Sequence, residues 1–204
     1  MEEYAYILDY LPQGLSFKNK DPICYAIGDS EFKLFELVPK ANAMIALDDR
    51  VYIGKDANLR KEIDHVKRRI GYDELTGTAV KELEFVVKDI VMANQDRFIR
   101  FYNEAGPISI KKHLLEELPG LGKKTVTEIL NARKAGPFKD FEDLKTRVPM
   151  LKDPVKLIVD RIILEISDRE RRHYIFIVRL TEKRPPDLSA RPEWSRRRAK
   201  ARTS

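Results

Sequence analysis

The sequence of this protein contains a single cysteine among its 204 residues, Cys24. One cysteine cannot form an internal disulfide, and it excludes a zinc site built from several thiolates. The chain also lacks an apolar run of about 18 residues and a secretory signal pattern, so we expect a cytoplasmic protein without a membrane partner. Cys24 lies among apolar residues, and we expect it in the core.

Signatures of catalysis are equally scarce. The sequence has neither the glycine-rich phosphate loop of nucleotide hydrolases nor the Gly-x-Ser-x-Gly turn of serine hydrolases. Its histidines lie far apart and lack the spacing of metal ligands. We therefore expect a protein that is not an enzyme and has neither a metal cofactor nor a small-molecule substrate. The alternative is a metal-dependent nuclease component, for which the candidate carboxylates are Asp48, Asp49, Asp64, Asp73 and Glu74.

Positive charge is unevenly distributed along the chain. The net charge is +6, yet residues 1–72 carry 11 basic and 12 acidic side chains. Residues 181–204 carry 8 basic and 3 acidic side chains, so we expect a disordered basic tail there. That tail either contacts phosphates or only solubilises the protein. Within the remaining chain, Lys67, Arg68 and Arg69 form one basic cluster, and a second surrounds residues 111–134.

The segment Leu118–Lys124 (LPGLGKK) joins two helical patterns, at Ser109–Glu117 and Lys123–Lys134. A connection this short folds two helices back on each other. Gly120 can adopt a positive φ after the first helix, and Gly122 lets a ligand approach the backbone. The second helix then begins with unpaired N–H groups, which form an anion site together with neighbouring cations. For a basic protein we expect that anion to be a backbone phosphate.

This hairpin predicts nucleic-acid binding that is largely independent of sequence, because phosphate contacts carry no base code. The alternative is a glycine-capped turn that binds nothing. The predicted binding residues comprise the hairpin, the first turn of its second helix and nearby cations: Gly120, Leu121, Gly122, Lys123, Lys124, Thr125, Lys112, Lys67, Arg68 and Arg69.

A second copy of this pattern begins 30 residues later, where Val148–Asp153 aligns with Leu118–Lys123. Met150 and Lys152 replace its two glycines, so we expect this hairpin to complete the packing of the first. Its flanking helices are expected at Phe141–Arg147, with Asp140 as N-cap, and at Pro154–Ile166, with Asp153 as N-cap.

The amino-terminal part contains the short alternating runs that are typical of β-strands. Five such runs in residues 1–72 predict a small OB-like β-barrel, with strands at 4–10, 23–27, 31–38, 51–54 and 62–70. Barrels of this kind stack single-stranded bases on exposed aromatic rings, although rings at every second position usually face the core. The candidate rings are Tyr4, Tyr6, Tyr10, Phe17, Tyr52 and Tyr72.

The remaining segments connect these two parts. Residues 73–105 change to helical periodicity, with expected helices at 76–94 and 95–105 that dock the barrel on the hairpins. Residues 106–167 then form an all-α tandem helix-hairpin-helix domain, and residues 168–180 form a strand that returns to the barrel. The expected fold class is therefore α+β.

The whole arrangement resembles an archaeal family of uncharacterised proteins described as binding nucleic acid, in which an OB-like barrel precedes tandem helix-hairpin-helix motifs. The resemblance rests on Leu118–Lys124, Val51–Gly54 and Arg69–Leu75. It implies binding of RNA or DNA without an established substrate, supplies no catalytic residues, and allows a monovalent cation on the hairpin carbonyls. The second possibility is a protein-interaction module in a ribosomal or repair assembly.

Overall fold

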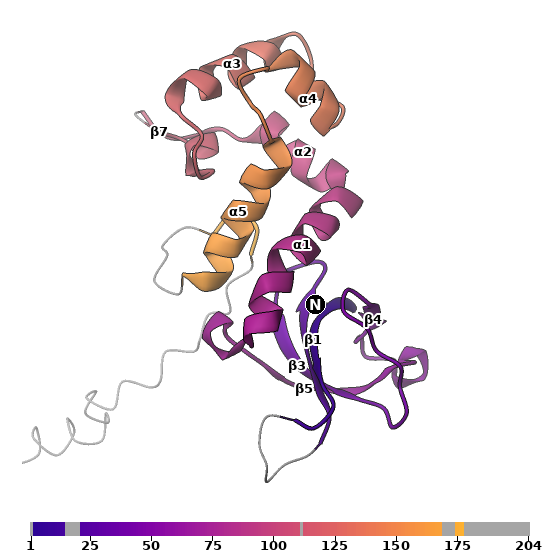
Figure 1. Cartoon of the computed structure of the whole chain (residues 1–204). Coiled ribbons are helices and arrows are strands. Elements are labelled where there is room, and N and C mark those ends of the chain that lie inside the picture. Colours follow the sequence, from indigo (N-terminus) through magenta and orange to yellow (C-terminus); the bar gives the residue numbers. More distant parts are fainter. Residues whose placement is uncertain (1, 15–20, 111, 169–173, 178–204) are drawn as a thin grey trace, which may run out of the picture.

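The computed structural model describes residues 2–14, 21–110, 112–168 and 174–177. In this part of the chain the fold is α+β, as expected, with a curled antiparallel sheet of five strands and five α-helices (Figure 1). The strands of the sheet are β1 (Tyr4–Leu11), β2 (Ile23–Gly28), β3 (Leu34–Pro39), β4 (Arg50–Tyr52) and β5 (Ile63–Arg69). The α-helices are α1 (Gly77–Ala93), α2 (Gln95–Glu104), α3 (Lys123–Lys134), α4 (Phe141–Arg147) and α5 (Pro154–Ser167). A ribbon of β6 (Pro107–Ser109) and β7 (Lys112–His113) and the short 3₁₀-helices η1 (Ala57–Leu59), η2 (Tyr72–Glu74) and η3 (Leu114–Glu117) lie between them.

The strands follow the order β4–β1–β2–β3–β5, and every neighbouring pair is antiparallel. Among the described residues the edge strands β4 and β5 do not pair with each other, so the sheet forms a half-barrel. Arg60 spans this gap, because its guanidinium donates to the carbonyl of Gly54 at 2.7 and 3.0 Å and to that of Asp64 at 2.9 Å. All five strands lie where the alternating runs predicted them, to within a few residues.

The central strand β2 is buried at every position because one core cluster lies on each face of the sheet there, whereas the edge strand β5 is mostly exposed. Ala5, Cys24 and Leu37 belong to a cluster formed only by residues of the sheet and its loops. Leu8 and Tyr25 belong to a second cluster, which includes the helices. Burial raises the pKa of the Cys24 thiol to about 12, so this cysteine is an inert core residue, as expected.

Helix α1 joins the sheet to the hairpins. The hydroxyl of its N-cap residue, Thr76, accepts the N–H of Ala79 at 3.1 Å and donates to Asp9 of β1 at 2.5 Å. The helix packs against both β1 and α5 (Figure 1). One core therefore continues from Tyr25 in the sheet to Ile162 in α5. The domain boundaries at residues 72, 105 and 167 stay predictions.

The prediction of a helix at Ser109–Glu117 is wrong. Within this segment Ser109, Lys112 and His113 belong to the β6–β7 ribbon, and only the last four residues form the 3₁₀-helix η3. The apolar side chain of Ile110 is fully exposed. The cause is local: Nδ1 of His113 accepts the N–H of Leu115 at 3.1 Å, and Glu116 accepts the N–H of His113 at 2.8 Å. This reciprocal cap starts a helical turn only after His113.

The sequence predicted a strand at residues 168–180. The structure describes residues 174–177 in the second half of this segment, and these four residues do not form a strand. These four residues lie against α5, where the carboxylate of Glu165 accepts the N–H groups of residues 175–177 at 2.8 to 3.1 Å. The end of that predicted strand and the basic tail at 181–204 lie outside the described residues.

Candidate nucleic-acid interface

The first hairpin forms the tight turn that the sequence predicted. Leu118 and Leu121 are buried, and the N–H of Leu121 donates to the carbonyl of Leu118 at 3.2 Å. Gly120 has a φ of +79°, a conformation that is costly for any residue with a Cβ. The two leucines therefore anchor the turn, and Gly120 is exposed between them.

Helix α3 begins directly after this turn, with Gly122 as its N-cap. Gly122 provides no side chain to accept the first N–H groups, and its φ of −84° is ordinary. A Cβ at this position would meet nothing within 4 Å. Lys123 and Lys124 are exposed, and Thr125 is half-buried. The start of α3 therefore combines N–H donors without a side-chain cap, two cations and open space.

The second hairpin repeats the turn but not the open helix start. The N–H of Leu151 donates to the carbonyl of Val148 at 2.9 Å, as in the first hairpin. Asp153 caps α5, as predicted, by accepting the N–H of Lys156 at 2.9 Å. Met150, which stands where the first hairpin has its positive-φ glycine, does not have a positive φ. The second hairpin therefore satisfies donors that the first leaves accessible.

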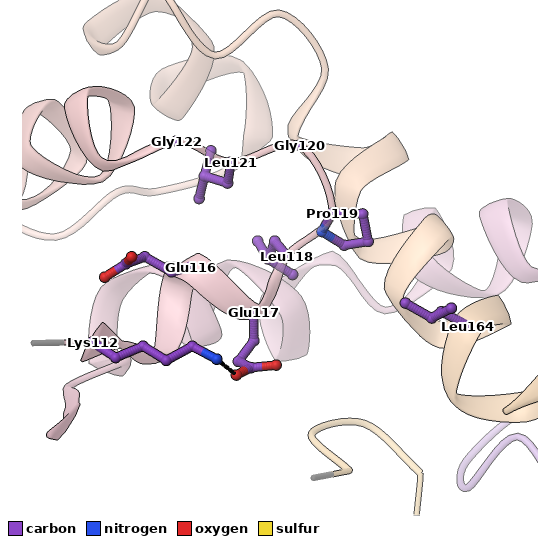
Figure 2. A pocket seen from close by; sticks show the side chains of 9 residues that line it. All are labelled: Lys112, Glu116, Glu117, Leu118, Pro119, Gly120, Leu121, Gly122 and Leu164. Atoms are coloured by element: carbon purple, nitrogen blue, oxygen red, sulfur yellow. Dashed lines mark ion pairs between the residues drawn. The ribbon is translucent and has the colours of Figure 1, made fainter. Parts of the chain in front are cut away.

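Lys112 was expected to add free charge beside the hairpin, and the structure corrects this. Its ammonium forms an ion pair with Glu117 (Figure 2). Glu117 also accepts from the guanidinium of Arg161, at 2.9 Å through its carboxylate and at 2.8 Å through its backbone carbonyl. The hydrogen bond from Lys112, with Arg161 nearby, holds the pKa of Glu117 below its usual range. The charge of Lys112 is therefore largely neutralised within the protein.

The sequence did not single out Arg161 and Glu165, which lie beneath this ion pair. They stand one helical turn apart on α5, both are buried, and Nε of Arg161 donates to Oε1 of Glu165 at 2.6 Å. Their signal in the sequence is an oppositely charged pair at positions i and i+4 within an apolar helix face. Because Glu165 also holds residues 175–177, this network connects the underside of the first hairpin with the carboxyl-terminal segment.

An open pocket of about 600 Å³ adjoins the first hairpin (Figure 2). The turn Leu118–Gly122 forms one wall, and the polar residues that precede it form the second. Leu164 contributes an apolar side chain from α5. The remaining lining residues are Lys112, Glu116 and Glu117.

The basic cluster of Lys67, Arg68 and Arg69 lies on β5, at the opposite end of the molecule from α3 (Figure 1). Lys67 and Arg68 both pair with the buried carboxylate of Glu36, at 2.6 and 2.8 Å. Arg68 also pairs with Glu74 at 2.6 Å. The structure therefore does not bring this cluster to the hairpin, and two of its three charges are partly neutralised within the sheet.

The tyrosines predicted to stack bases are half-buried. Tyr4 and Tyr52 contact each other edge to face, with ring centroids 5.2 Å apart, and the guanidinium of Arg50 lies 3.7 Å from the ring centre of Tyr4. Tyr6 and Tyr72 pack against the core that includes the helices, and Tyr10 packs against the core of the sheet. Phe17 lies outside the described residues.

Within the described ranges, no three His, Cys, Asp or Glu side chains form a group that could hold a metal ion. The candidate nuclease carboxylates, among them Asp48, Asp64 and Asp73, are therefore not assembled into such a group. None of the helices in these ranges is long and apolar enough to cross a membrane.

Known proteins share this architecture. Residues 1–178 match the family described as "Protein of unknown function (DUF655)". The chain belongs to this family. The chain is also similar to "Uncharacterized protein MJ0038" of Methanocaldococcus jannaschii. The two sequences are 44% identical over 177 residues, which cover 86% of this chain and 80% of that protein.

The DUF655 fold is also present in a solved structure. The crystal structure of Af1531 from Archaeoglobus fulgidus, itself assigned to DUF655, is similar to this chain with a TM-score of 0.81 and 36% identity. The match covers 87% of this chain and 100% of that one. The archaeal relatives and the mixed α+β architecture that the resemblance implied are thereby confirmed.

Proposed function

We propose that this DUF655 protein binds RNA or DNA by holding a backbone phosphate at the first hairpin. The amides of Gly120, Gly122, Lys123 and Lys124 donate to the phosphate, and the two lysine ammonium groups add charge. The observation that carries the proposal is the contrast between the two hairpins: Asp153 caps the helix after the second, whereas α3 has no side-chain cap. Helix starts with accessible N–H groups attract anions.

The proposal extends to the two structural parts. The two turns form a tandem helix-hairpin-helix unit whose first helix is the 3₁₀-helix η3. It is supported by the matching turns, in which Leu121 donates to Leu118 and Leu151 donates to Val148. The curled sheet is an OB-like half-barrel, supported by its five antiparallel strands. Because Lys67 and Arg68 are already paired with Glu36, this half-barrel adds a preference for strand shape rather than the main phosphate contacts.

Fluorescence anisotropy with labelled single- and double-stranded DNA and RNA of equal length tests the proposal. The titrations are repeated over a series of salt concentrations, with the full chain and with a chain that ends at residue 180. Neutralising about three to five phosphates gives a slope of log K against log salt of roughly −3 to −4. Binding by the shorter chain with this slope supports a site outside the tail. Binding by the full chain alone contradicts the proposal.

The decisive variant is Gly122→Glu, which places bulk and negative charge where the phosphate is held. Its backbone φ and the open space around it allow this side chain without disturbing the turn. The matched control is Met150→Glu, because Met150 is 52% exposed on the second hairpin and the change adds the same charge. We expect Gly122→Glu to abolish binding and Met150→Glu to retain it. Equal affinities for the two variants contradict phosphate binding at the first hairpin.

A second candidate function is a protein-interaction module in a ribosomal or repair assembly. It is favoured by Phe85 and Met92, which lie seven positions apart on α1 and are 64% and 49% exposed. Residues at this spacing share one helix face. Co-sedimentation of the tagged chain with ribosomal subunits from its source organism distinguishes the two functions. Loss with Phe85→Glu but not with Gly122→Glu favours the interaction module.

A further inference from the structure

We propose that the pocket beside the first hairpin accepts one unpaired nucleotide, and that it prefers a base with an exocyclic amino group over uracil or thymine. This inference rests on the proposed function and names its ligand class, which is single-stranded nucleic acid or a duplex with an unpaired nucleotide. Neither the family description nor the proposed phosphate contacts imply any base preference.

The position of the pocket supports this assignment. The turn Leu118–Gly122 forms a pocket wall on one side and leads into the uncapped start of α3 on the other (Figure 2). A strand whose phosphate is held at that helix start therefore has its neighbouring sugar and base at the mouth of the pocket. The same backbone segment positions both parts of one nucleotide.

The charge of the pocket lining determines which part of the nucleotide can enter the pocket. Glu116 and Glu117 both line the pocket, and among the described lining residues the single cation, Lys112, is paired with Glu117. The lowered pKa of Glu117 keeps its carboxylate ionised at neutral pH. Like charges repel, so a phosphate is disfavoured inside this pocket. The phosphate belongs at the start of α3, and the pocket is left for the uncharged sugar and base.

The size and lining of the pocket suit a single nucleotide. Its volume of about 600 Å³ lies within the range of roughly 300–1,000 Å³ that is typical of small-molecule sites. Pro119 and Leu164 offer apolar contacts for the face of a base. A single nucleotide is on the scale of such sites.

The Glu116 carboxylate determines which base is preferred, because both oxygens of Glu117 already accept from Lys112 and Arg161. Ionised Glu accepts hydrogen bonds and cannot donate them, and it pairs with the amino group of cytosine in known readout. Adenine, cytosine and guanine carry exocyclic amino groups, and guanine adds a neighbouring ring N–H donor. Pairing in a duplex uses these same groups. We therefore expect the preference to be strongest for an unpaired guanine and absent from a fully paired site.

The test compares two short labelled RNAs of equal length with the full chain. One RNA contains only uridine, and the other carries a single guanosine at its centre. The guanosine RNA is expected to bind about fivefold more tightly, near the lower end of the range for one carboxylate–base contact in an open site. Both RNAs present the same number of phosphates to the protein, so the ratio of the two affinities reports on recognition of the base.

Glu116→Gln is the variant of choice, because Gln can still accept the N–H of His113 as Glu116 does at 2.8 Å. The fold is thereby kept while one pocket carboxylate is removed. Glu142→Gln is the control. Glu142 is an exposed residue in the first turn of α4, and its substitution removes the same charge away from the pocket. We expect the guanosine preference to fall to about onefold with Glu116→Gln and to persist with Glu142→Gln.

The outcomes separate this inference from the function on which it rests. Equal affinity of the wild-type protein for both RNAs overturns the nucleotide pocket and leaves the phosphate site intact. A guanosine preference that survives Glu116→Gln and also Leu164→Trp, which fills the pocket from α5, likewise overturns it. Absence of RNA binding, or binding unaffected by Gly122→Glu, overturns the proposed function and this inference together.

Discussion

The buried guanidinium of Arg161 donates to the buried carboxylate of Glu165 at 2.6 Å, one turn later on α5. Lys156 and Asp160 form a second ion pair with the same spacing on the same helix, at 2.9 Å, but at its surface. Removing a pair from water costs free energy that only its partner and further hydrogen bonds offset. The two pairs therefore allow the effect of burial to be measured at constant geometry.

Glu165→Gln is expected to lower the free energy of unfolding by about 3–5 kcal/mol, because it removes a charge partner from a buried guanidinium. It also weakens the hydrogen bonds that hold residues 175–177. Asp160→Asn is expected to cost less than about 1 kcal/mol, since exposed pairs contribute little. Urea unfolding followed by circular dichroism measures both. Equally small losses of stability in the two variants would show that Glu117 alone compensates the buried charge of Arg161.

The two hairpin glycines are expected to respond differently to alanine. Gly120→Ala places a Cβ on a backbone with a φ of +79° and is expected to destabilise the protein by about 1–2 kcal/mol. Gly122→Ala is expected to change stability by less than about 1 kcal/mol, because its φ is −84° and the added Cβ meets nothing within 4 Å. Thermal unfolding of the two variants provides the measurement, and equal shifts would contradict their separate roles.

Glu117 makes stability depend on pH in the acidic range. Its pKa in the folded protein is lowered from the usual 4.5, mainly by the hydrogen bond from Lys112. A lowered folded pKa means that the unfolded state binds the proton more readily, so this stabilisation is present above 4.5 and is lost as the pH falls below it. The Glu117→Gln variant is expected to be less stable than the wild type at neutral pH. Its free energy of unfolding is expected to fall less steeply than that of the wild type as the pH is lowered.

Urea midpoints measured from neutral to acidic pH test this expectation. Glu142→Gln serves as the control, because it removes an exposed carboxylate of α4. The control should follow the wild-type curve. A Glu117→Gln curve parallel to the wild type would mean that other carboxylates set the pH dependence.

Features decided within a few residues could be predicted from the sequence. Asp140 accepts the N–H of Asp143 at 2.7 Å, and Asp153 caps α5, both as predicted. The positive φ of Gly120 follows from the same local logic. By contrast, the prediction of a helix before the first hairpin was wrong. His113 acts as an N-cap, so helical structure begins only at Leu114. Apolar spacing alone does not reveal a cap made by a histidine.

Features that depend on distant residues could not be predicted. Lys67 and Arg68 read as a free basic cluster, but the register of β3 against β5 places Arg68 opposite Glu36. The carboxylate of Glu2 accepts the N–H groups of Ser30 and Glu31 at 2.9 and 2.8 Å, a contact that only the folded sheet creates. Strand pairing therefore decides whether the cations of β5 stay unpaired, whereas Lys123 and Lys124 are exposed at the first hairpin.

That conclusion leads to the most direct functional prediction. Replacing both Lys123 and Lys124 by Gln is expected to weaken nucleic-acid binding by about one to two orders of magnitude and to reduce the salt slope by about 2. The control replaces Lys81 and Lys88 by Gln, because these lysines are also exposed but lie on α1. Anisotropy titrations over a salt series measure both variants. Equal losses in the two would mean that net charge sets the affinity, and the first hairpin would then be a packing element.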